Sequence, residues 1–105
     1  MKFGLKDSVI EQVEMILGRY PQVEKAILYG SRAMGNYKRG SDIDLTLIGD
    51  ELTLTTLCRI MDEIDDLLLP YTFDLSIYHQ IGDPDLLDHI RRVGVTFYER
   101  QLVSV

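Results

Sequence analysis

Two apolar runs, Ala26-Ile27-Leu28-Tyr29 and Leu45-Thr46-Leu47-Ile48, flank Gly30-Ser31 and Asp42-Ile43-Asp44 and decide the fold of this chain. Each run has the length and composition of a short buried strand, so the sequence predicts strands over 25–29 and 42–48. Alternate residues of a strand face the same side, so Asp42 and Asp44 would project together, about 7 Å apart. An ionised carboxylate in an apolar layer is costly unless it is paired or binds a metal. These positions therefore predict a functional site.

A third carboxylate, Asp74, lies in a similar run, Thr72-Phe73-Asp74-Leu75-Ser76-Ile77. On a neighbouring strand it would complete an oxygen-rich site for Mg²⁺, which binds carboxylates together with substrate phosphates. The Gly30-Ser31 turn offers backbone amides and a hydroxyl to a phosphate chain. These features predict nucleotidyl transfer from a nucleoside triphosphate, with two Mg²⁺ ions serving the attacking and leaving oxygens.

Each aspartate also has a purely structural explanation. Asp42 can cap a turn after Ser41, and Asp44 can be exposed at the edge of a sheet. Asp74 can pair with a basic side chain. All three aspartates downstream of one Gly-Ser turn favour the catalytic interpretation, because three carboxylates in apolar strands cost stability without a metal.

The segment from Gly30-Ser31 through Asp42-Ile43-Asp44 resembles the G-S-x10-D-x-D signature of the polymerase beta-like nucleotidyltransferases. Length and layout make the chain similar to the minimal nucleotidyltransferases (MNT) that are partnered with HEPN proteins. Met34 stands where the family often has a second arginine. The resemblance implies the nucleotidyltransferase fold, with the Gly-Ser turn and the carboxylate strands facing one cleft.

The same resemblance implies an activity and a partner. The chain would transfer AMP from ATP to a tyrosine of a cognate HEPN toxin, as the antitoxin of a type VII toxin–antitoxin system. Two alternatives stay open: adenylylation of a small molecule, and a non-catalytic module that neutralises its partner by contact. The presence of all three aspartates favours the enzyme.

Composition limits the other possibilities. The 105 residues suit one domain, 1–105, and their net charge of −6 argues against direct binding of nucleic acid, which depends on Lys and Arg. No apolar run is long enough to cross a membrane, and no signal peptide opens the chain. One cysteine, Cys58, suits a reducing cytoplasm.

Periodicity and turn residues predict the remaining elements. Asp7 or Ser8 would cap a first helix ending near Leu17, and Asp83-Pro84 would begin the last helix. Apolar residues at 54, 57, 58, 61, 64 and 68 predict a helix over 53–69. A helical turn at 32–36, a strand at 72–77 and an extended segment at 95–98 complete an α+β (α/β) domain with a mixed sheet.

Several other side chains are weaker candidates. Arg32, and with it Lys38 and Arg39, could neutralise phosphates, although solvated loop cations are equally consistent with the pattern. The helical stripe predicts that Cys58 is buried. The two histidines, His79 and His89, lack companions at zinc spacing and are both expected at the surface.

Overall fold

The structure, a computed structural model, describes residues 1–101. Its elements follow in the order α1 (Asp7–Gly18), β1 (Lys25–Tyr29), α2 (Ser31–Met34), β2 (Ile43–Ile48), α3 (Leu54–Asp65), β3 (Phe73–Ile77), the 3₁₀ turn η1 (Tyr78–Gln80), α4 (Pro84–Val93) and β4 (Val95–Glu99). This order agrees with the one predicted from the sequence. Within the described residues, no helix is long and apolar enough to cross a membrane.

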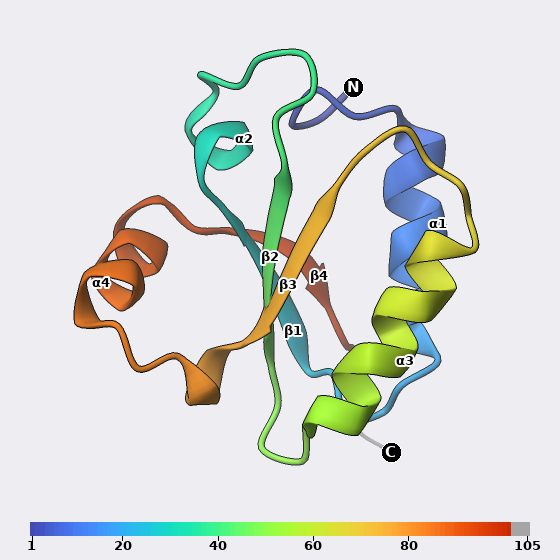
Figure 1. Ribbon diagram of the computed structural model, residues 1–105, viewed down its shortest axis with the longest axis vertical. Coiled ribbons are helices and arrows are strands. Elements are labelled where there is room, and N and C mark those ends of the chain that lie inside the picture. Colours follow the sequence, from blue (N-terminus) through green and yellow to red (C-terminus); the bar gives the residue numbers. More distant parts are fainter. Residues whose placement is uncertain (102–105) are drawn as a thin grey trace.

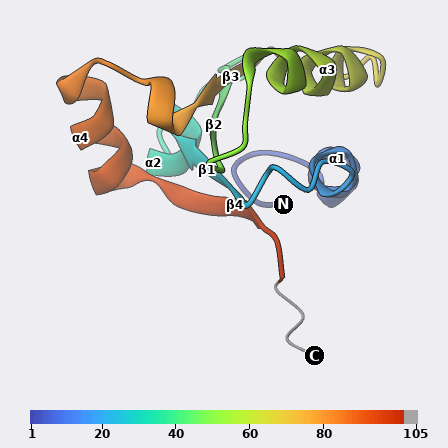
Figure 2. The same cartoon turned by 90° about the horizontal axis from the view of Figure 1, so that it is seen from below.

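The strands form one mixed sheet in the order β3-β2-β1-β4. The strand β1 is antiparallel to both β2 and β4, whereas β2 and β3 are parallel and are joined through α3. The helices α1 and α3 cover one face of the sheet, and α2 and α4 lie on the other (Figures 1 and 2). The predicted mixed sheet with helices packed against it is confirmed.

The core lies between the sheet and the pair α1 and α3. Alternate residues of β2 point to this face, and Ile43, Leu45 and Leu47 are all fully buried. They pack in one cluster with residues of α1 and α3, among them Val13 and Ile60. The period of two along β2 therefore sends the intervening residues, which include Asp44, to the face that carries α2 and α4.

Helix starts are set by side-chain caps in two of the three long helices. The Asp83 carboxylate accepts a hydrogen bond from the Asp85 amide, with Pro84 at the first turn of α4, as predicted. The Thr53 hydroxyl accepts from the Thr56 amide at the start of α3. The helix α1 begins after Lys6 without a side-chain cap, so the predicted cap by Asp7 or Ser8 is wrong.

The helix α3 is rotated relative to the predicted stripe. Leu57, Ile60 and Ile64 are its buried residues, whereas Leu54 is 64% exposed and Cys58 is exposed. The prediction of a buried Cys58 is therefore wrong. Two sets of apolar residues at helical spacing overlap on this helix. Packing against the sheet buries the set centred on Ile60, because an isoleucine side chain fills more of the core than the side chain of Cys58 would.

Substitutions can test this rotation. Ile60→Ala should lower the free energy of unfolding by about 2–5 kcal/mol, because it leaves a cavity in the core. Leu54→Ala, on the same helix, should change it by no more than about 0.5 kcal/mol, as is usual at exposed positions. Urea unfolding followed by circular dichroism measures both, and equal losses would contradict the observed orientation of α3.

Candidate active site

Two of the predicted carboxylates are direct neighbours in the sheet. Asp44 of β2 pairs in register with Asp74 of β3, and on its other side it pairs with Tyr29 of β1. Asp42 lies just before β2, two residues from Asp44, and its charge acts on that carboxylate. Asp44 is half-buried, and Asp42 and Asp74 are exposed. The structure thus brings the three aspartates to one end of the sheet.

The Gly30-Ser31 turn meets the carboxylates at this end. Gly30 ends β1 with φ +77° and ψ −158°, a backbone conformation that is essentially restricted to glycine, and Ser31 begins α2. A Cβ atom added to Gly30 would overlap Asp44 Oδ2. The absence of a side chain at Gly30 is therefore what allows the Asp44 carboxylate to lie against the Gly30-Ser31 turn.

The surroundings of Asp44 disfavour its ionised form. Burial raises the pKa of Asp44 above its ordinary value, and the negative charges of Asp74 and Asp42 raise it further, while His89 opposes this effect. A carboxyl group with a raised pKa is destabilised in its ionised form. A cation bound beside Asp44 would therefore relieve the cost of its ionised form.

The donor set suits Mg²⁺, although it is not a preformed cage. Within residues 1–101, no three side chains among His, Cys, Asp and Glu are already grouped as a metal centre. Mg²⁺ is usually held by one or two carboxylates, with substrate phosphates and water completing its shell. The facing pair Asp44 and Asp74 supplies such carboxylates, and their mutual repulsion gives a cation a reason to bind, so the residues present fit this metal.

Several polar groups on the same face were not predicted. Thr46 and Ser76 pair in register two residues beyond Asp44 and Asp74. Among the described residues, their buried hydroxyl oxygens have no hydrogen-bond partner of normal geometry. Burial raises the pKa of Tyr29, the adjacent Ser76 hydroxyl lowers it, and Asp74 and Asp44 raise it. Thr46 and Ser76 therefore continue the polar face of the sheet beyond the two aspartates. The alternation of polar and apolar residues along β2 and β3 could have indicated this from the sequence.

The two histidines lie in different environments. His79 is exposed on η1, as expected. His89 is half-buried, and its ring meets Tyr29 edge-on with a centroid distance of 6.2 Å, so the prediction that it faces solvent is wrong. Its spacing from Leu86 and Val93 on α4 was the available signal, because residues three or four apart share a helix face.

Arg32 does not extend into solvent as a loop cation. It is only 3% exposed, and its guanidinium donates to the backbone oxygens of Ser41 (3.0 Å) and Phe3 (2.9 Å). These bonds fix the loop that precedes Asp42 against the N-terminal segment. Arg32 therefore holds the site's framework together, and its predicted role in phosphate binding stays untested.

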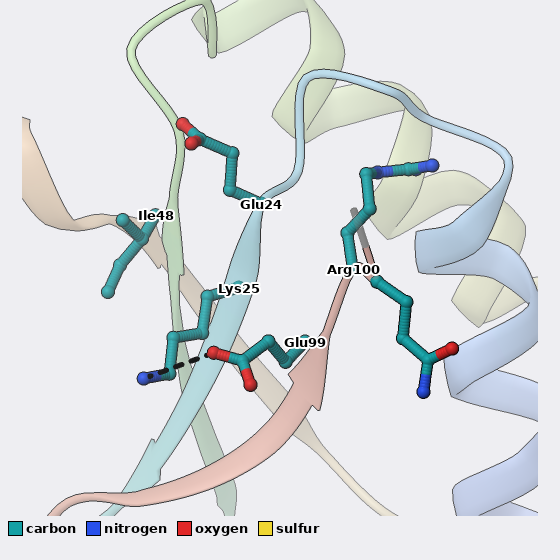
Figure 3. A pocket seen from close by; sticks show the side chains of 6 residues that line it. Glu24, Lys25, Ile48, Glu99 and Arg100 are labelled. Carbon is teal, nitrogen blue, oxygen red and sulfur yellow. Dashed lines mark ion pairs between the residues drawn. The ribbon is translucent and has the colours of Figure 1, made fainter. Parts of the chain in front are cut away.

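A cavity of about 610 Å³ lies at the opposite end of the sheet. Figure 3 shows its side chains, including Lys25 and Glu99, whose ion pair spans 3.6 Å. Arg100 donates there to the backbone oxygens of Val23, Gly18 and Tyr20. None of the predicted site residues lines this cavity. Arg100 thus links the end of β4 to the segment between α1 and β1, which is a structural role.

The contact between Gly30 and Asp44 makes a first prediction for the site. We expect Mg²⁺ with ATP to raise the melting temperature of the wild type by binding its folded state. Gly30→Ala should abolish that rise, because the new methyl group would displace the Asp44 carboxylate. Gly35→Ala is the control: its φ is also positive, +84°, but a Cβ there meets no atom within 4 Å. It should cost about 1 kcal/mol of stability from strain and retain the nucleotide-dependent rise.

The raised pKa of Asp44 makes a second prediction. The stability lost through this group grows as pH rises from its ordinary pKa of 3.8 through the raised value, so Asp44→Asn should stabilise the metal-free protein at neutral pH. The gain should be up to about 1 kcal/mol, as for like charges on adjacent strands. It should vanish near pH 4 or below in urea unfolding. Asp62→Asn, on the exposed side of α3, should show no such gain; a destabilised Asp44→Asn protein would indicate a structural role.

Comparison with solved structures places this fold among nucleotidyltransferases. A toxin–antitoxin structure determined with AMP-PNP has a TM-score of 0.69 and 19% identity, covering 92% of this chain and 76% of the other. A tri-AMPylated Shewanella oneidensis HEPN toxin in complex with MNT antitoxin gives 0.67 and 14%, covering 91% and 74%. A putative nucleotidyltransferase from Sulfolobus solfataricus gives 0.51 and 21%, covering 92% of each chain. At these identities the likeness establishes the fold.

Sequence comparison identifies the family. No protein of curated function matches the chain significantly. The sequence profile of the family described as "Polymerase beta, Nucleotidyltransferase" matches residues 11–102, which include the Gly-Ser turn and all three aspartates. The chain therefore belongs to the polymerase beta-type nucleotidyltransferases.

Proposed function

We propose that this protein is an Mg²⁺-dependent nucleotidyltransferase that moves AMP from ATP to a hydroxyl group, the acceptor being a tyrosine of a HEPN-type toxin. The observation that carries the proposal is the in-register pair Asp44 and Asp74 beside the Gly30-Ser31 turn. The similarity to an antitoxin bound to an AMPylated HEPN toxin supports the choice of partner, and the similarity to a structure with AMP-PNP supports the nucleotide. The chain would then be the minimal, MNT-type antitoxin of such a pair.

In this proposal the turn and Ser31 bind the phosphates. The first amides of a helix have no acceptor within the helix, so the amides of Ser31 and Arg32 are available to phosphate oxygens. The Ser31 hydroxyl adds a further donor. Holding the triphosphate here aligns its α-phosphorus with the carboxylate end of the sheet, and alignment supplies much of the catalysis in phosphoryl transfer.

The aspartates act on the acceptor and on the metal. Asp42, Asp44 and Asp74 would hold Mg²⁺, which when bound neutralises charge on the phosphates. Asp74, the exposed member of the facing pair, accepts the proton of the attacking hydroxyl. A bond forms between that oxygen and the α-phosphorus, the bond from the α-phosphorus to the bridging oxygen breaks, and pyrophosphate leaves.

The toxin in the Shewanella complex carries three AMP groups. We include successive transfer in the proposal: after the first step, the acceptor hydroxyl belongs to the ribose of the AMP already attached. The same residues serve each round, because each round forms the same bond at an α-phosphorus.

The decisive experiment incubates the purified chain with Mg²⁺, ATP and the protein that its neighbouring gene encodes, and measures the intact mass of that partner. Wild type should add AMP to a tyrosine. Asp74→Asn should lower the rate at least about a hundredfold, within the range that general bases contribute. Asp62→Asn, which removes the same charge from the exposed side of α3, should retain the activity.

Other outcomes of this experiment have a definite meaning. Tight binding without transfer, with toxin neutralisation surviving the loss of Asp42, Asp44 and Asp74 together, would establish the non-catalytic module instead. Transfer to a small molecule and not to the partner would replace the proposed acceptor and keep the chemistry.

A further inference from the structure

A second cavity, of about 500 Å³, opens near the carboxylates without including them. Its side chains include Arg32, Lys38 and Arg39 and the rings of Tyr37 and Tyr71, and no Asp or Glu lines it. In a chain with a net charge of −6, such a concentration of positive charge is unusual. We call it the Arg32 cavity.

Arg32 is the buried charge at this cavity. Its guanidinium carbon lies 5.3 Å from the centroid of the Tyr37 ring and 5.4 Å from that of Tyr71, within cation–π range. Within residues 1–101, no Asp or Glu forms an ion pair with it. Its guanidinium has five N–H donors, and two backbone carbonyl oxygens, those of Ser41 and Phe3, accept hydrogen bonds from it. A buried cation without a counter-ion is costly, so an anion in the cavity would be strongly favoured.

The Arg32 cavity and the site share their supporting segments. Arg32 follows Ser31, and its Nε donates a hydrogen bond to the carbonyl oxygen of Ser41, the residue before Asp42. Tyr71 lies on the segment that leads to Asp74. The loop over 35–42, the N-terminal segment and the loop before β3 gather at one end of the molecule, beyond β2 and β3 (Figure 1). A ligand there would reach toward the carboxylates from a different side than the Gly30-Ser31 turn, which does not line the cavity.

We propose that the Arg32 cavity binds a nucleotide already attached to the acceptor, and so positions it for the next transfer. The inference rests on the proposed function, in which successive rounds use the ribose of an attached AMP. Arg32, Lys38 and Arg39 would neutralise the phosphodiester, as arginine does through charge-assisted hydrogen bonds. The tyrosine rings would stack on the base, which aromatic side chains do for any base.

The chemistry of the added round is balanced. A hydroxyl of the bound ribose forms a bond to the α-phosphorus of a new ATP, the bond from that phosphorus to the bridging oxygen breaks, and pyrophosphate leaves. Asp74 takes the hydroxyl proton. The Arg32 cavity contributes only position, so its residues are positioning residues and not catalytic ones.

Binding is tested first, without any transfer. The full chain carrying Asp44→Asn and Asp74→Asn is titrated with adenylyl-adenosine, a dinucleotide with one phosphodiester, by calorimetry. Lys38→Gln with Arg39→Gln should weaken the binding about tenfold, equivalent to 1.4 kcal/mol. Lys25→Gln with Arg59→Gln removes the same charges from residues that do not line the cavity, and should weaken it less than about twofold. Absent binding, or equal effects of the two pairs, would overturn the proposal.

Transfer is tested next, with ATP and the partner. Lys38→Gln with Arg39→Gln should lower the ratio of doubly to singly nucleotidylated partner about tenfold, and an unchanged ratio would overturn the proposal. Arg32→Lys, which keeps the charge but loses the fork, should lower this ratio too if circular dichroism shows that it folds. If wild type transfers no AMP at all, the proposed function fails, and the calorimetric titration still decides whether the cavity binds a nucleotide.

Discussion

Parallel pairing of β2 with β3 places two carboxylates, Asp44 and Asp74, side by side on one face of the sheet. Much of the structure follows from this register. Parallel strands need a crossover, which α3 provides, and the crossover buries the other face of β2 beneath α1 and α3. The cost of two like charges is thus offset by a fully apolar core on the opposite side of the same strands.

Gly30, which follows the last residue of β1, allows the Gly30-Ser31 turn to approach this pair of carboxylates. Because Gly30 has no side chain, the antiparallel strand β1 can end in a turn directly against the Asp44 carboxylate. A single chain reversal therefore places backbone donors, suited to phosphates, next to acidic groups, suited to a cation. This combination within a few residues suits the substrate proposed above, a nucleoside triphosphate with bound Mg²⁺.

Charge is separated across the loop between α2 and β2. The carboxylates begin with Asp42 and continue onto the strands, whereas Arg32 and the exposed Lys38 and Arg39 precede Asp42 in the chain and line the Arg32 cavity. The hydrogen bond from Arg32 Nε to the Ser41 carbonyl oxygen fixes the loop between the two groups. Met34, on the neighbouring helix α2, is 48% exposed and adds no charge there. The charged side chains that line this cavity are therefore opposite in sign to the net charge of the chain.

The sequence by itself determined the order of the elements, the strand that follows Asp42 and carries Asp44, and the Gly30-Ser31 turn between β1 and α2. Those features depend on local periodicity and on residues such as Gly30 whose backbone is special. Tertiary structure alone decided that Asp44 faces Asp74 in register, that Ile60 and not Cys58 is buried, that His89 packs on Tyr29, and that Arg32 is buried between two tyrosines. The physical reason is that helix rotation and strand register minimise the exposed apolar area of the whole domain, which no local pattern contains.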